Sequence, residues 1–173
     1  MRTACAALAA VLLPLLVAAP ARAVDRCAPE RHPWHVALGA GAGIGLFFAS
    51  HGRVGLSVGR ILADRFEVEL TLHYDGATDL AGHEEALRLG VLLDFSRRWE
   101  LMLGWRVGHA RHHKQLPAGS LWVDSLVASL VGELRLALAQ RWQLRLTPFA
   151  ATGYWNEIWG FTLEPSAGLA FRF

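Results

Sequence analysis

The sequence predicts an all-β fold, an eight-stranded antiparallel up-and-down transmembrane β-barrel that follows an N-terminal signal peptide. Three observations lead there: side chains alternate in residues 161–173, the chain is apolar without a spanning helix, and a turn motif recurs. In 161–173 the odd-numbered residues are apolar or small, whereas the even-numbered ones include Thr162, Glu164 and Arg172. A period of two residues is that of a β-strand. A strand in a membrane barrel alternates in this way because one face meets lipid and the other the lumen.

Residues 1–23 are typical of a secretory signal peptide. Arg2 gives a positive start, residues 6–19 form an apolar run, and Ala21-Arg22-Ala23 is an A-x-A cleavage site. We expect cleavage after Ala23, then a short periplasmic tail at 24–33 and one barrel domain at 34–173. An uncleaved membrane helix is the alternative, but the apolar run is short and no stop-transfer pattern follows.

The composition excludes several classes of protein. The chain is 53% hydrophobic and 18% charged, yet its most apolar mature stretch, 121–138, carries Asp124, Glu133 and Arg135 and cannot be a spanning helix of ~20 uncharged residues. High apolar content without such a helix is expected of a membrane barrel. The net charge of +2 gives no reason to expect a nucleic-acid partner. Loss of the signal peptide leaves Cys27 alone, so no internal disulfide can form.

A short motif recurs three times and marks turns. It consists of arginine, an aromatic residue, Glu or Gln, and an alternating run, at 65–70, 98–103 and 141–146. Few residues separate each copy from the preceding strand-like run, which favours tight hairpins. A soluble meander with repeated turns is the alternative. In a membrane barrel the aromatic residues would lie at one boundary of the bilayer. The expected aromatic girdle consists of Phe66, Trp99, Trp142, Phe171 and Phe173.

The turns and the alternation together predict eight strands. We expect them at 34–49, 53–62, 66–75, 85–95, 99–110, 121–138, 142–154 and 161–173. An even number of strands places both ends of the chain on one side, which is the periplasm in outer-membrane barrels. The three tight turns then share that side, and the other, mostly longer connections point outward.

Charged residues occur mainly on the predicted inner face. An eight-stranded barrel is only wide enough for its own side chains, and buried charges must be paired. We therefore expect these charges to pair across a filled, non-conducting lumen. On the outer face only Arg60 and Asp124 are charged, near strand ends where the cost in lipid is small. The expected interior network consists of Glu67, Glu69, Arg88, Asp94, Glu100, Arg106, Glu133, Arg135, Arg145, Glu164 and Arg172.

This layout resembles the small eight-stranded outer-membrane barrels of Gram-negative bacteria, the OmpA-transmembrane and OmpX-like group. The resemblance rests on the signal peptide, the alternating strands, the aromatic-led turns and the final Phe173. It implies a bacterial outer-membrane location among lipids and lipopolysaccharide. It also implies recognition of the strand that ends at Phe173 by the barrel-assembly machinery. Members of the group include adhesins, tethering proteins, lipid-binding barrels and lipid A-modifying enzymes, so the fold does not choose a function.

Two weak candidate sites lie near the predicted outer loops. His109, His112 and His113 are candidate metal ligands, because imidazoles that converge can bind a metal ion. A polar, partly cationic rim facing lipopolysaccharide phosphates is the simpler interpretation. A triad of His109, Ser120 and Asp124 can be written down, but the His-x-Ser pair of lipid A deacylase barrels is absent. We expect no cofactor. Tyr154 and the residues after it are expected to anchor the barrel in the interface.

The sequence thus favours a structural or surface-interaction role without catalysis. One alternative is an outer-leaflet enzyme that acts on lipid A or phospholipid. A narrow channel or small-molecule binder is another, and the charged inner face argues against an apolar ligand.

Overall fold

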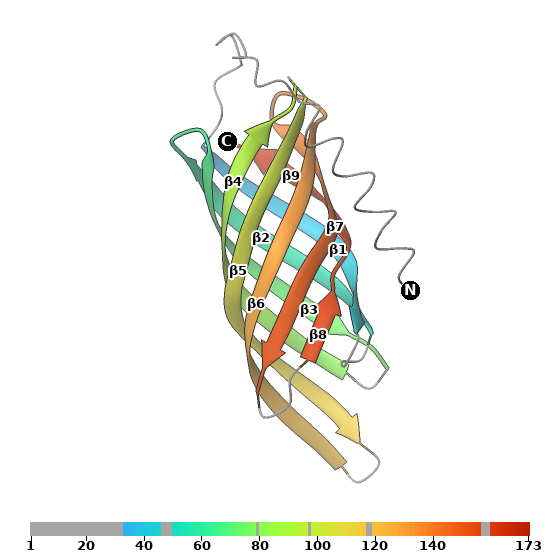
Figure 1. The fold of residues 1–173 in the computed structure, drawn as a ribbon. Helices are drawn as coiled ribbons and strands as arrows, with labels where there is room; N and C mark the ends of the chain where they lie inside the picture. The colour runs from blue at the N-terminus through green and yellow to red at the C-terminus, as the bar shows by residue number, and fades with distance from the viewer. Residues whose placement is uncertain (1–32, 46–49, 79, 97, 117–118, 157–159) are drawn as a thin grey trace, which may run out of the picture.

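The computed structural model describes residues 33–45, 50–78, 80–96, 98–116, 119–156 and 160–173. Within these ranges the chain forms nine β-strands and no helix, and the strands close into a barrel with eight strand positions (Figure 1). The predicted fold class is confirmed. The predicted signal peptide and its cleavage site, and all of the tail except Pro33, lie outside the described residues. No helix in the described residues is long and apolar enough to cross a membrane, a finding that does not concern strands.

From β1 to β8 each strand pairs antiparallel with its neighbour in sequence, and the last strand, β9, pairs with the first. The strands are β1 (Trp34–Gly45), β2 (His51–Leu62), β3 (Phe66–Gly76), β4 (Leu80–Asp94), β5 (Trp99–Leu116), β6 (Gly119–Ala137), β7 (Trp142–Trp155), β8 (Gly160–Leu163) and β9 (Ser166–Arg172).

The strands β8 and β9 together fill the eighth position, because both pair with β7 and with β1. They are separated at Pro165, which has no N–H for the ladder. The Pro165 carbonyl still accepts a hydrogen bond of 3.0 Å from the amide of Ala42. The expectation of one continuous strand at 161–173 is therefore corrected to a strand interrupted beside Glu164.

Several strands are longer than predicted. The strand β4 begins at Leu80 instead of residue 85, and β5 continues to Leu116 instead of residue 110. Pairing from Leu80 with Lys114 to Leu116 with Gly119 carries the sheet through segments expected to be loops. As a result the β5–β6 hairpin projects beyond the other strands (Figure 1). The predicted extension of the first strand over 46–49 lies outside the described residues.

A bulge in β7 reverses which residues face inward. Gly132 pairs with Phe149 and Leu134 with Leu146, so Thr147 and Pro148 lie opposite one residue of β6. A bulge of this kind accommodates a proline that cannot donate to the ladder. Before the bulge the odd-numbered residues of β7 are buried, and after it the even-numbered ones are. Tyr154 is consequently fully buried in the lumen, and the prediction that it anchors the rim is wrong.

The predicted tight turn between β2 and β3 is present. Ala63 and Asp64 both have positive φ, at 48° and 59°, and the amide of Arg65 donates to the carbonyl of Leu62 at 3.2 Å. This geometry is a type I′ turn, whose twist matches that of paired strands. The turns β2–β3, β4–β5 and β6–β7 lie at the same end of the barrel as the C-terminal residue (Figure 1). We call this end the turn end and the opposite end the loop end.

The two faces of the barrel differ sharply. Large apolar side chains cover the outside, with Leu38, Leu70 and Leu130 each 60–65% exposed. Water would not favour such a surface on a monomer, whereas a lipid bilayer would. Inside, a small apolar cluster contains Met102 and Leu92, but most buried side chains are polar or charged. The lumen therefore holds most of the buried polar and charged groups of the described chain.

Candidate functional site

Charged side chains fill the turn-end half of the lumen. The turn-end cluster consists of His35, Glu67, Glu69, Arg88, Glu133, Arg135 and Arg145, all buried. Arg135 on β6 lies at its centre and donates to both carboxylate oxygens of Glu67 on β3, each at 2.6 Å, and to Glu133 at 2.6 Å. The fork geometry of a guanidinium suits such a two-point contact with a carboxylate. Arg135 thereby connects opposite walls of the barrel.

Two further arginines complete this cluster. Arg88 on β4 forms ion pairs with Glu67, Glu69 and Glu133 at 3.0, 2.7 and 2.9 Å. Arg145 on β7 pairs with Glu69 at 2.6 Å. Three carboxylates thus face three guanidiniums, so the cluster is neutral when His35 is neutral. Charge balance of this kind allows buried ions to be tolerated.

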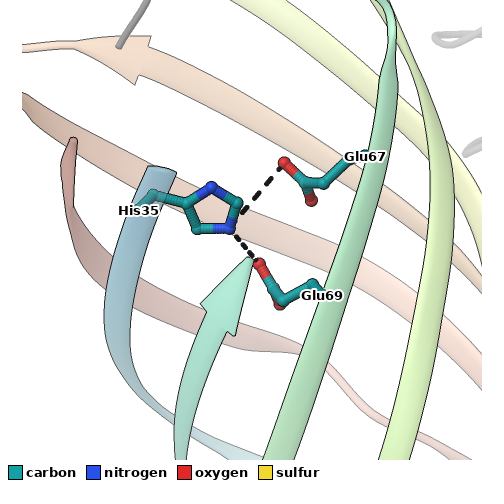
Figure 2. A group of neighbouring side chains, drawn as sticks. All are labelled: His35, Glu67 and Glu69. Carbon is teal, nitrogen blue, oxygen red and sulfur yellow. Dashed lines mark hydrogen bonds and ion pairs between the residues drawn. The ribbon is translucent and has the colours of Figure 1, made fainter. Parts of the chain in front are cut away.

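His35, Glu67 and Glu69 have the spacing of a possible metal site (Figure 2). The His35 Nε2 lies 2.7 Å from a Glu69 oxygen and 3.9 Å from a Glu67 oxygen. Both carboxylates, however, already bind arginines, and a divalent cation would lie beside those guanidiniums and be repelled. The chemistry of these residues therefore fits an ion-pair network rather than a metal centre.

A second set of charges fills the loop-end half of the lumen. The loop-end cluster consists of Arg53, Asp75, Glu84, Arg106, Tyr154 and Glu164. Arg53 on β2 pairs with Asp75 at 2.6 Å, with Glu164 at 2.5 Å and with Glu84 at 3.0 Å, and it donates to the Tyr154 hydroxyl at 2.9 Å. The Tyr154 hydroxyl in turn donates to Glu164 at 2.9 Å. Glu164, beside the break at Pro165, is thus held by side chains of β2 and of the neighbouring strand β7.

Arg106 on β5 ties the loop-end cluster to the hydroxyl-bearing wall. It pairs with Glu84 at 3.1 Å and Glu164 at 2.6 Å and donates to Ser129 and Thr152 at 3.0 and 3.2 Å. Three carboxylates share two arginines here. Three inward-facing histidines adjoin the carboxylates: His112 lies 3.1 Å and His51 3.6 Å from Asp75, and His73 lies 3.5 Å from Glu84.

A cavity of about 90 Å³ separates the two clusters. It is lined by side chains of both, among them Arg88, Arg106 and Arg145, and by small residues such as Gly39, Gly55 and Ser57. A space of this size beside charged groups has room for a few water molecules and is smaller than the pockets that hold drug-sized ligands.

No family model and no curated protein matches this chain. Solved structures do. Neisserial surface protein A is similar with a TM-score of 0.63 and 16% identity, over 81% of this chain and 96% of that one. The N-terminal β-barrel domain of Pseudomonas aeruginosa OprF gives 0.63 and 13%, over 80% and 97%. Ail, the attachment invasion locus protein of Yersinia pestis, gives 0.54 and 8%, over 82% and 97%.

The chain has the fold of a small outer-membrane β-barrel. Because these identities are low, the likeness establishes the fold and leaves the activity open.

Most of the predicted interior charges of this outer-membrane barrel lie together. Six belong to the turn-end cluster, and Arg106 and Glu164 belong to the loop-end cluster. Arg172 pairs with Glu100 at 2.6 Å, and both contact Gln143 at the turn-end mouth. Asp94 is the exception, since it is exposed at the last position of β4.

Sequence reasoning missed Arg53, Asp75 and Glu84. Asp75 continues the alternation of Glu67, Glu69, Thr71 and His73, so its burial could have been found by extending β3 by that pattern. The sequence predicts a loop at Glu84 and the start of a strand at Arg53. No local signal pairs them, because residues far apart in sequence meet only when the barrel closes.

The structure does not assemble the candidate metal site. Since β5 continues through residues 109–116, neighbouring histidines point to opposite faces: His112 is buried, and His109 is exposed with His113 on the same outer side. His113 packs instead against the ring of Trp122 at 4.8 Å.

The candidate triad is also separated. His109 lies 3.3 Å from Asp124, but Ser120 comes four residues before Asp124 on β6. Four residues of extended strand span about 13 Å, so Ser120 cannot contact the same histidine. Among the described residues these three do not form a nucleophile and base.

The girdle residues lie at the turn end of the barrel. Phe66, Trp99, Trp142 and Phe173 are 39–55% exposed. The rings of Trp142 and Phe171 are 5.2 Å apart, and those of Phe171 and Phe173 are 6.3 Å apart. Such a group suits the boundary between lipid and water.

Proposed function

We propose that this protein is an integral protein of the bacterial outer membrane whose filled lumen does not conduct, and whose role is structural or in contacts at the cell surface. The supporting observation is the pair of ion-pair clusters that cross the lumen. An eight-stranded barrel leaves room only for its own side chains, and here those side chains bind one another.

Conduction would require the clusters to separate. Breaking a buried ion pair leaves an uncompensated charge and costs about 3–5 kcal/mol. Arg135 contacts carboxylates on two strands, and Arg53 contacts three carboxylates. We therefore expect the lumen to open only rarely.

Single-channel recording in planar bilayers tests the proposal. The wild-type protein is expected to give no discrete current steps. The double variant Glu67→Ala with Arg135→Ala removes an oppositely charged pair from the turn-end cluster without a change in net charge. We expect this variant to give small current steps. Arg111→Gln, an exposed change at the loop end, serves as the matched control and is expected to stay silent. Wild-type steps as large as those of the double variant would overturn the non-conducting lumen.

Orientation follows from the same proposal. The tight turns face the periplasm, the projecting β5–β6 hairpin faces the cell exterior, and the strand that ends at Phe173 is the segment recognised by the barrel-assembly machinery. Cleavage after Ala23 belongs to this proposal as well.

A change from apolar to polar side chains on the outer face supports the position of the outer membrane boundary. On β4 and β5 the apolar residues give way to Glu85 and to His109 and Arg111. Arg111 is 3.6 Å from Asp124 and lies over the Trp122 ring at 5.0 Å. We propose that these polar residues of the outer face lie at the headgroups of lipopolysaccharide. Because Arg111 is paired with an acid, they carry less positive charge than the sequence alone suggests.

A further inference from the structure

The recurring arginine-aromatic motif contributes no arginine to the turn-end or loop-end cluster of the lumen. The arginines that open its three copies are Arg65, Arg98 and Arg141, and all three are exposed. Within the described residues, none of them forms an ion pair. They lie at the turn end, each directly before a girdle residue.

The backbone holds each arginine at the same place relative to the next hairpin. The carbonyls of Arg65, Arg98 and Arg141 accept hydrogen bonds of 2.7–2.8 Å from the amides of Leu92, Ala137 and Arg172. Each motif is thus fixed to the neighbouring strand, which pairs with the strand that the motif opens. The backbone of all three arginines is therefore held in the same way at the turn end of the barrel.

A fourth position repeats the arrangement with different residues. The carbonyl of Pro33 accepts a bond of 2.7 Å from Ile61, as the motif arginines do. Trp34 follows it, and the guanidinium of Arg60 from the adjacent strand lies 5.2 Å from the centre of the Trp34 ring. Arg60 therefore supplies the charge that Pro33 lacks.

An arginine consequently lies beside the aromatic residue that opens β1, β3, β5 and β7, every second strand around the barrel. We propose that Arg60, Arg65, Arg98 and Arg141 form an arginine belt that binds the phosphate groups of anionic phospholipids in the periplasmic leaflet. This inference rests on the proposed outer-membrane orientation.

The chemistry of the belt favours this ligand. Aromatic side chains at the bilayer boundary place the preceding residue at the depth of the headgroups, and the guanidinium fork matches phosphate oxygens. Asp64 and Asp94 are the exposed acids at the described turn end, so the four arginines outnumber them. Each basic residue close to an anionic surface strengthens binding about fivefold at low salt.

Equilibrium folding in lipid vesicles tests the belt. The complete protein is reconstituted in phosphatidylcholine vesicles with and without phosphatidylglycerol, and urea unfolding is followed at low and high salt. For the wild type, phosphatidylglycerol is expected to raise the folding equilibrium constant by tenfold or more, and salt should abolish the gain. The triple variant Arg65→Gln, Arg98→Gln, Arg141→Gln should lose most of it.

Two controls separate charge from misfolding. The corresponding triple lysine variant is expected to retain most of the gain, and Arg111→Gln, at the loop end, should retain all of it. A glutamine variant that is merely misfolded would be weakened in pure phosphatidylcholine too, and its ratio between the two lipids would match the wild type. Such an equal ratio would overturn the arginine belt and leave the outer-membrane proposal intact. If the wild type inserted into neither vesicle, the outer-membrane proposal itself would fail.

Discussion

At the scale of single residues, charge pairing in the lumen follows from alternation only in part. The inward position of Glu67 and Arg135 could be predicted, because a period of two assigns a face without knowledge of any partner. Which carboxylate meets which arginine could not be predicted, since Arg135 and Glu67 lie on strands far apart in sequence. His112 was placed wrongly for a different reason: its strand is longer than its turn signals indicate.

Among the residues of the turn-end cluster, we expect substitution of Arg135 to lower the free energy of unfolding the most. Replacement by methionine, which is unbranched, shorter and uncharged, removes one partner of Glu67 and of Glu133 in a buried site. We expect a loss of about 3–5 kcal/mol in the free energy of unfolding. Urea titration in vesicles measures it, with the exposed pair broken by Arg111→Gln as a control that should lose no more than about 1 kcal/mol. Equal losses would contradict the importance of the cluster.

Ala63 is expected to limit the stability of the β2–β3 turn. Its φ of 48° lies in the left-handed region, where a Cβ costs about 1–2 kcal/mol. Ala63→Gly should therefore raise the free energy of unfolding by about 1 kcal/mol, after subtraction of the added chain entropy. The same substitution at Ala139, for which no positive φ occurs, should give no gain. A loss at Ala63 would contradict the type I′ geometry.

At the scale of elements, the strands were predictable where lipid imposes a clean alternation and less so elsewhere. The starts of β3, β5 and β7 agree with the turn motif. The ends at the loop side do not, because pairing in β4, β5 and β6 continues where the apolar outer pattern stops. The bulge in β7 was hidden because one extra residue changes the face of every later side chain.

Removal of that bulge gives an element-scale prediction. Deletion of Pro148 leaves Thr147 alone opposite Glu133, so the ladder becomes regular and residues 149–154 keep their partners and their faces. We expect this variant to fold nearly as well as the wild type, measured as the heat-modifiable band on gels. Deletion of Ala151, which lies in the regular ladder, should cause a large loss of folded protein, because β7 must slip or turn Tyr154 toward lipid. Equal losses for the two deletions would argue against a bulge at Pro148.

At the scale of the whole molecule, the eight strand positions and the two chemically different faces were predictable from the sequence. A membrane barrel has no free sheet edge, which explains why β9 must reach β1. The break at Pro165 does not disturb this closure, since Glu164 and Pro165 are held by Arg53 and Ala42. The projecting hairpin and the arginine belt could not be predicted, because both depend on how far each strand extends along the barrel axis relative to its neighbours.

One measurement tests the two-faced barrel most directly, a spin-label scan of β3 in lipid vesicles. Single cysteines at 66 to 74, in a chain with Cys27→Ser, carry the label, and collision with oxygen and with a water-soluble nickel reagent is recorded. The account predicts high oxygen accessibility at Val68, Leu70 and Leu72 and low accessibility to both reagents at Glu67, Glu69 and Thr71. Uniform accessibility to the nickel reagent along β3, without a period of two, would contradict it.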